Sequence, residues 1–124
     1  NTSSTKNLYM HTVEYHSIEA VAWKVWAVTG TAAGGTAITP TNLNLGSGRT
    51  AEASCMGGGA TITGLTIGAQ IGVHRTQATG EAGMDFGQGL ILAPNTAIAV
   101  EYDAGTTGLC EIDCIFHFEV IGAT

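Results

Sequence analysis

Four histidines and ten acidic residues are the first candidates for a metal site. Successive side chains of a strand point to opposite faces, so His11 and His16, which are five residues apart, are expected on opposite faces. No pair has the spacing of a known metal motif. A sandwich fold could still bring His74 and His117 together. We interpret all four as surface or edge histidines and predict no bound metal.

A serine or cysteine nucleophile would need a strained turn with histidine and acidic partners. The nearest pattern, SCMG at residues 54–57, lacks the GxSxG arrangement. Glu111 and Asp113 would share the solvated face of one strand, about 6.6 Å apart, which is typical of a solubilising surface. The glycines at 57–59 lack the lysine and the helix of a phosphate loop and indicate a bulged or mobile turn. The sequence therefore predicts no catalytic residue, no cofactor and no enzyme activity.

The composition of the chain argues against several classes of protein. The chain has 124 residues, enough for one domain with a single core, and it is 44% apolar but only 11% charged, unlike a disordered chain. Its net charge is −6, and its four basic residues are scattered, whereas nucleic-acid binding needs a clustered basic surface. No apolar window reaches about 20 residues, and the first residues are polar where a signal peptide would be basic and then apolar. We expect a soluble domain with no nucleic-acid and no membrane partner.

The three cysteines are Cys55, Cys110 and Cys114. They form neither an even disulfide framework nor a CxxC pair. If Cys110 and Cys114 share one strand, they stand about 13 Å apart, too far for a disulfide. We predict that the cysteines are small, buried apolar residues.

The pattern of apolar residues predicts an all-β fold, because apolar residues alternate between glycine-rich turns and no helical period is present. The expected strands are residues 9–15, 18–28, 51–55, 61–65, 69–74, 83–86, 89–92, 96–102 and 108–120. The last two are predicted to form a hairpin through the turn DAGTTG at 103–108. Eight or nine short strands favour an antiparallel β-sandwich that is jelly-roll-like, with a closed barrel as the competing geometry.

Two regions are candidate contact surfaces. In the strand at 18–28, Val21, Trp23 and Val25 form the predicted core face, which leaves Lys24 and Trp26 on the outer face. An outward tryptophan is a candidate contact residue, unless another part of the same domain covers it.

The other region is the polar segment at residues 1–7, NTSSTKN, which has no apolar anchor before Leu8. It is expected to be a flexible N-terminal arm that is disordered or lies on a neighbour, with residues 8–124 as the single sandwich domain. The candidate partner-binding residues are Thr2 and Lys6 on this arm and Lys24 and Trp26 on the outer face.

Three stretches resemble small virion proteins of tailed bacteriophages: GTAITPTNLNLGSGRT at 35–50, ILAPNTAIAVEY at 91–102, and a final strand that ends in Phe118-Glu119. The matching positions are Gly35, Thr36, Ala37, Thr39, Pro40, Asn42, Asn44, Leu92, Pro94 and Asn95. The sequence departs from the pattern after Asn44, where the glycine loop is short and lacks an Asn-Ser run. That departure leaves open which loop contacts the shell, and it leaves tail or head-fibre attachment open as well.

The resemblance implies a capsid decoration, or cement, protein on the outer surface of the virion, assembled in the host cytoplasm. Its partner would be the major capsid protein, and it would itself be a homo-oligomer, a trimer or a dimer. The alternative is a glycan-binding module or phage adhesin on the same fold, with Trp26 or Tyr102 as a stacking platform. A weaker third reading is a metal-dependent or hydrolytic enzyme that uses His74, His117 and nearby acids.

Overall fold

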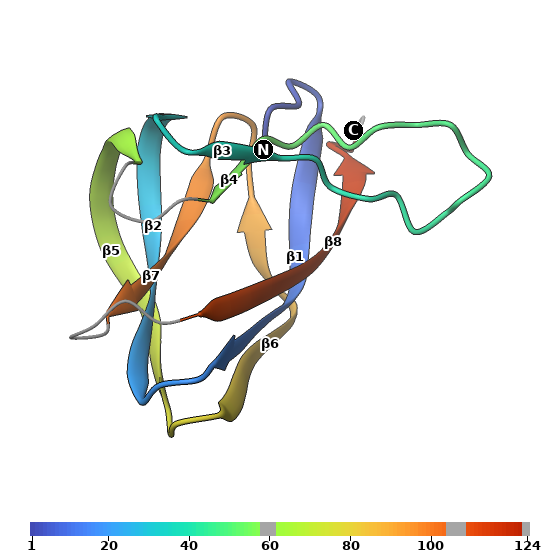
Figure 1. Ribbon diagram of the computed structural model, residues 1–124. Helices are drawn as coiled ribbons and strands as arrows, with labels where there is room; N and C mark the ends of the chain where they lie inside the picture. Colours follow the sequence, from blue (N-terminus) through green and yellow to red (C-terminus); the bar gives the residue numbers. More distant parts are fainter. Residues whose placement is uncertain (58–61, 104–108, 123–124) are drawn as a thin grey trace.

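The computed structural model describes residues 1–57, 62–103 and 109–122. Eight strands are present in this part of the chain: β1 (Lys6–Ser17), β2 (Val21–Ala33), β3 (Thr36–Ile38), β4 (Cys55–Gly57), β5 (Thr63–Thr76), β6 (Gly80–Leu92), β7 (Ala97–Asp103) and β8 (Cys110–Val120). Two antiparallel three-stranded sheets, with the strand orders β6-β1-β8 and β5-β2-β7, pack against each other, and β3 pairs with β4 in a small separate sheet (Figure 1). The predicted antiparallel β-sandwich is confirmed. Among the described residues no helix is long and apolar enough to cross a membrane.

The hairpin predicted from residues 96–102 and 108–120 is wrong. β7 pairs with β2 and β8 pairs with β1, so the two consecutive strands belong to opposite sheets. The chain also changes sheets between β1 and β2 and between β5 and β6. Alternating apolar residues show that a strand has a buried face. The same alternation is found whether the next strand of the chain pairs beside it or packs across the core, so the pattern does not show which strands pair. Residues 104–108 of the predicted turn lie outside the described residues.

The strands are longer than expected. The two strands predicted at 61–65 and 69–74 are one continuous strand, β5, although residue 61 lies outside the described part. The two strands predicted at 83–86 and 89–92 are likewise one strand, β6. Glycine in a strand here marks an irregularity rather than a turn: Gly87 has a φ of +58° and stays within β6. The strand expected at 51–55 is mostly loop, and β3 was not predicted because it has only three residues.

The core lies between the two large sheets. The predicted core face of β2 is confirmed, since Val21, Trp23 and Val25 are all buried. Trp23 has no exposed surface; its ring stacks on Tyr15 with centroids 5.0 Å apart, and its Nε1 donates a hydrogen bond to Thr76 Oγ1 at 3.2 Å. The residues of the main cluster are Leu8, Met10, Val13, Tyr15, Val21, Trp23, Val25, Met84 and Leu92.

The Tyr15 hydroxyl makes the domain sensitive to alkaline pH. The side chain is 1% exposed, its hydroxyl has no hydrogen-bond partner among the described residues, and burial raises its pKa to about 12. Because the folded state holds this proton more tightly than the unfolded state, the stabilisation is complete below pH 10 and is lost as the pH rises toward 12. The full loss is about 2.7 kcal/mol, and about half of it is reached at pH 11. We expect Tyr15→Phe to remove this part of the alkaline loss, measured as urea midpoints at pH 8 and pH 11, whereas Tyr9→Phe should keep it.

The N-terminal segment 1–7 differs from the expected free arm. Lys6 and Asn7 already belong to β1, and Asn1 donates hydrogen bonds from its amino group to the Thr96 carbonyl at 3.0 Å and from Nδ2 to the Leu92 carbonyl at 2.8 Å. Ser3 is buried, and its Oγ accepts the Lys6 N–H. Polar side chains supply backbone partners here. The segment thus lies against the β6–β7 turn of its own domain without an apolar anchor.

Candidate functional site

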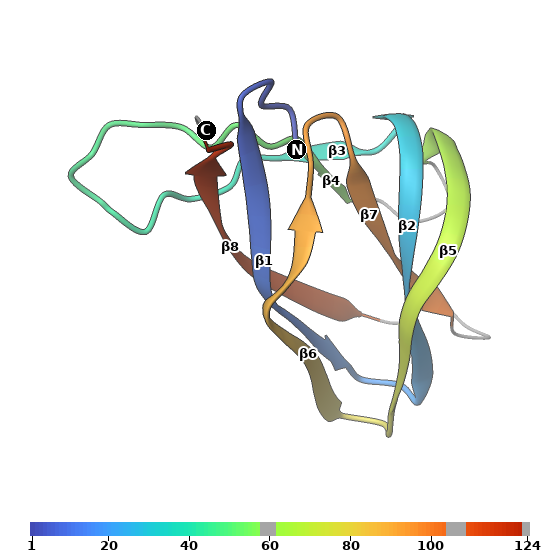
Figure 2. The same ribbon diagram turned by 180° about the vertical axis from the view of Figure 1, so that it is seen from behind.

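Residues 39–54, between β3 and β4, form the protruding loop, whose middle extends away from the sandwich (Figures 1 and 2). Near its middle stand Leu43 and Leu45, which are 76% and 85% exposed. The short β3–β4 ladder, in which Ile38 pairs with Cys55, closes its base. An exposed pair of leucines on a projecting segment is a candidate contact with another protein.

The protruding loop is shaped by its own hydrogen bonds. Asn42 Oδ1 accepts the Asn44 N–H at 2.9 Å, while Asn42 Nδ2 donates to Ser47 Oγ at 2.7 Å and to the Arg49 carbonyl at 3.0 Å. The Ser47 N–H in turn donates to the Asn44 carbonyl at 3.0 Å. Such side-chain-to-backbone bonds fix a turn without a hydrophobic core. The loop therefore presents its leucines while several of its polar groups are satisfied internally.

The predicted contact residues Thr2 and Lys6 lie at the base of this loop. The Thr2 N–H donates to the Glu52 carbonyl at 2.9 Å, and the Lys6 ammonium forms an ion pair with the Glu52 carboxylate. The hydrogen bond from Lys6, followed by one from Ser3, lowers the pKa of Glu52. Both residues thus tie the N-terminal segment to the protruding loop. Sequence spacing gave no sign of this long-range pairing.

The predicted contact residues Lys24 and Trp26 lie on the outer face of the sheet β5-β2-β7. Trp26 is half-buried, and its Nε1 donates to Glu101 Oε2 at 2.8 Å; Lys24 Nζ lies 2.6 Å from Asp103 Oδ2. The hydrogen bond between this pair raises the pKa of Lys24 and lowers that of Asp103. We call Lys24, Trp26, Glu101 and Asp103 the Trp26 patch. In this patch an indole ring lies beside two carboxylates, and each carboxylate accepts a hydrogen bond from a neighbouring side chain.

Tyr102, the other predicted stacking platform, belongs to the interior. Its ring packs edge-on against Trp23 with centroids 5.0 Å apart, and its hydroxyl lies 3.3 Å from Ser17 Oγ. Of the two predicted stacking platforms, Trp26 and Tyr102, only Trp26 therefore lies on the outer face.

The outer face of the other sheet, β6-β1-β8, is acidic. Glu14, Glu81, Glu111 and Asp113 line a shallow cavity of about 480 Å³ with His16, whose Nδ1 lies 3.9 Å from Glu111 Oε2. We call it the acidic surface. Within residues 1–57, 62–103 and 109–122, no three ligating side chains are placed to hold a metal ion.

The prediction that His11 and His16 lie on opposite faces is wrong. A register shift in β1 between Met10 and Thr12 adds one residue, so both histidines face outwards on the same sheet. His11 Nε2 lies 2.6 Å from His117 Nδ1, and the other nitrogen of His117, Nε2, is 3.0 Å from Glu119 Oε1. His74 lies on the other sheet with its ring against Tyr15, so the pair His74 and His117 is not brought together.

The prediction of buried cysteines is wrong for β8. Cys110 and Cys114 are exposed, Cys55 is half-buried, and all three are free thiols. Cys110 pairs with Ser17 and Cys114 with Val13, both inward residues of β1, so the two cysteines are on the inner side as their alternation indicates. Because β8 is an edge strand, the opposite sheet does not fully cover it.

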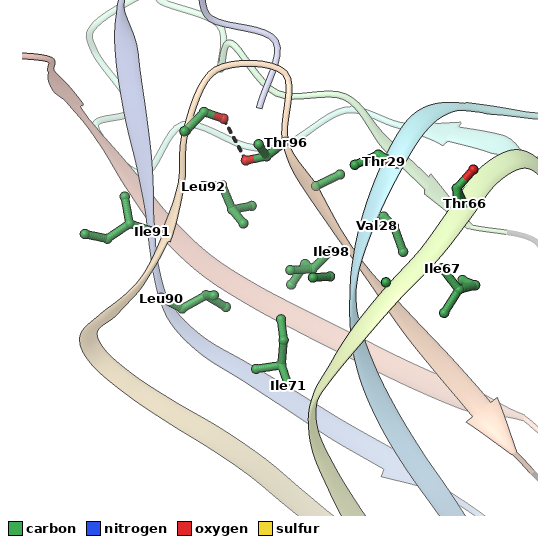
Figure 3. A pocket seen from close by; sticks show the side chains of 14 residues that line it. Val28, Thr29, Thr66, Ile67, Ile71, Leu90, Ile91, Leu92, Thr96 and Ile98 are labelled. Carbon is green, nitrogen blue, oxygen red and sulfur yellow. Dashed lines mark hydrogen bonds between the residues drawn. The ribbon is translucent and has the colours of Figure 1, made fainter.

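A second concave surface, the apolar groove, has a volume of about 370 Å³. It opens between β5 and β2 on one side and β6 with the start of β7 on the other (Figure 3). Its main aliphatic lining is Val28, Ile67, Ile71, Leu90, Ile91 and Ile98.

Sequence reasoning missed the groove and the exposed Leu43 and Leu45. The leucines carried one available signal, because they follow Pro40 in a stretch with no partner strand and no alternation that would bury them. The groove carried none, since its walls come from four strands. Comparison with known proteins found no matching protein family, no matching curated protein and no matching solved structure.

Proposed function

We propose that this protein is a structural, non-enzymatic component of a tailed-bacteriophage virion that decorates and cements the capsid by bridging major capsid protein subunits. The observation that carries the proposal is its exposed apolar surface. Among the described residues, more large aliphatic side chains are exposed than buried, and they include Leu45 at 85%, Leu109 at 77% and Val120 at 69%. Extensive exposed apolar surface on a soluble domain marks contact with other proteins. The sequence resemblance supplies the class of partner.

Bridging suits a small domain with several modest contact surfaces. A stable interface usually takes about 800 Å² from each partner. A domain that touches several subunits of one lattice at once gains from effective concentration, so contacts that are weak singly become long-lived together. Subunits held in this way resist the outward pressure of packaged DNA.

The two outer faces are suited to different neighbours. The acidic surface gathers four carboxylates, Glu14, Glu81, Glu111 and Asp113, so covering it would leave negative charge without water. In the Trp26 patch, Glu101 and Asp103 each accept a hydrogen bond. An aromatic side chain with compensated charge around it is typical of the centre of a protein interface. The Trp26 patch is therefore the shell-facing surface in this proposal, and the acidic surface faces solvent.

Trp26→Ala should weaken binding to capsid shells about 10-fold or more, because interface tryptophans are frequent hot spots. The measurement is co-sedimentation of the purified protein with DNA-free shells of major capsid protein from the same genome, titrated over protein concentration. Glu81→Gln on the acidic surface is the control and should bind like the wild type. A wild-type protein that stays in the supernatant would contradict the capsid function, whereas full binding by Trp26→Ala would contradict only the assigned face. Hits on a glycan array that depend on Trp26 would favour the adhesin alternative.

A further inference from the structure

We infer that the apolar groove receives the protruding loop of a second copy of this chain, so that copies join head to tail. This inference goes beyond capsid decoration, because it concerns what the protein does with itself in the absence of any shell.

The groove has the chemistry of a receptor for aliphatic side chains. Ile67, Ile71 and Ile91 are 56%, 38% and 48% exposed around it, and no charged residue lines it (Figure 3). One of its few polar groups, the Thr96 hydroxyl, already donates to the Ala93 carbonyl at 2.8 Å. Its volume of about 370 Å³ is within the range of pockets that enclose a small ligand.

The protruding loop offers a matching insert. Leu43 and Leu45 are the most exposed aliphatic residues of the loop, and their neighbours Asn44 and Gly46 are uncharged. The Asn44 N–H and carbonyl are both bonded within the loop, to Asn42 Oδ1 and to the Ser47 N–H. Inserting a polar group without a partner into an apolar site is costly, so this internal bonding is what an inserting loop requires.

The loop of one copy cannot fill the groove of the same copy. The protruding loop leaves the body on the side of β1 and β8 (Figure 2), while the residues that line the groove belong to β2, β5, the end of β6 and the start of β7. An occupant of the groove would therefore come from another molecule, and a second copy carries the matching insert.

Charge also favours this pairing of surfaces. Two copies with a net charge of −6 repel each other, and the acidic surface repels its own equivalent. The groove has no charged lining residue, and the protruding loop carries one basic residue, Arg49, and one acidic residue, Glu52, which is paired with Lys6. Contact between loop and groove therefore joins surfaces of little net charge and buries none of the carboxylates that line the acidic surface.

The small area of one loop–groove contact favours a closed assembly in which several such contacts act together. Two leucines and the groove walls bury much less than the roughly 800 Å² per partner of a stable interface. A head-to-tail contact repeats, and in a closed ring each copy donates one loop and accepts one, so no single contact has to hold alone. The expected assembly is a closed ring of few copies.

The test is the mass of the purified protein in solution by light scattering, without shells, over a range of protein concentrations. The wild type should be an oligomer of discrete mass. The double variant Leu43→Asp/Leu45→Asp and the groove variant Ile67→Asp should both be monomeric. Leu109→Asp, at a leucine that is equally exposed but belongs to neither surface, should keep the wild-type mass. A far-UV circular dichroism spectrum like that of the wild type and a cooperative melting transition confirm that each variant folds, as expected for side chains exposed in the single copy. The monomeric variants should melt at a lower temperature than the wild type, because association stabilises the folded state.

A cross-link tests the pairing directly. Leu45→Cys/Ile67→Cys should join copies covalently under mild oxidation, while Leu109→Cys/Ile67→Cys, with the same native thiols, should not. A monomeric wild type, a loop variant that keeps the oligomer, or a groove variant that keeps it while the loop variant loses it would each overturn the inference. Shell binding is measured separately, so failure here leaves the capsid proposal intact.

Discussion

Trp23→Ala is expected to lower the free energy of unfolding by about 3–5 kcal/mol, as for other fully buried aromatic residues truncated to alanine. Trp23 has no exposed surface and lies between Tyr15, on which it stacks, and Tyr102, which meets it edge-on. The substitution would open a cavity at the centre of the sandwich and leave the Thr76 hydroxyl without the indole donor. Against a typical total of about 5–15 kcal/mol, the loss removes about a fifth or more of the stability.

The matched control is Trp26→Ala, the same substitution three residues along the same strand. Its indole lies on the outer face and bonds an exposed carboxylate, so we expect a loss of less than about 1 kcal/mol. Urea unfolding followed by far-UV circular dichroism measures both, since the signal does not depend on either tryptophan alone. Equal losses at the two positions would contradict the placement of the core between the two sheets.

Gly30→Ala should lower the free energy of unfolding by about 2–4 kcal/mol, combining backbone strain with steric overlap. Gly30 has a φ of +97°, and a Cβ added there would stand 2.3 Å from the Gly64 carbonyl oxygen. Gly64 is constrained in turn, because its φ is +80° and its own Cβ would stand 2.4 Å from the Thr31 carbonyl oxygen. Both obstacles are backbone atoms, which a side-chain rotation does not relieve.

Gly87→Ala separates the two contributions. Gly87 also has a positive φ, +58°, but a Cβ there would meet no atom within 4 Å, so only the conformational cost of about 1 kcal/mol remains. The midpoints of urea unfolding of the two variants give the comparison. Equal losses from the two alanines would contradict the close approach of β2 and β5 at Gly30.

The properties that the sequence predicted correctly depend on neighbouring residues in one strand. The alternation in β2 separated the buried Trp23 from the outward Trp26, and the alternation in β8 placed Glu111 and Asp113 on the solvated side. Fold class follows from the same signal, because every strand with one apolar face needs a second layer to cover it.

The predictions that were wrong concern properties that depend on which strands pair and on where the register shifts. One inserted residue between Met10 and Thr12 moved His11 to the face of His16 and His117, and nothing in the local pattern indicates such an insertion. The cysteines of β8 alternate like core residues, yet the width of the opposite sheet decides whether they are covered. The Lys6–Glu52 ion pair joins residues 46 apart, which no local spacing reveals.

The crossing of the chain between sheets has a consequence for how the domain folds. In both large sheets the central strand pairs with strands far away in sequence, β1 with β6 and β8, and β2 with β5 and β7. Neither large sheet therefore contains a hairpin of consecutive strands that could form early and act as a template, and long loops must close before the first ladder stabilises them. Topologies of this kind fold in milliseconds to seconds rather than microseconds. During synthesis, β1 and β2 emerge before the strands that pair with them are made, so their aliphatic faces stay uncovered. In that interval, association with other chains competes with folding.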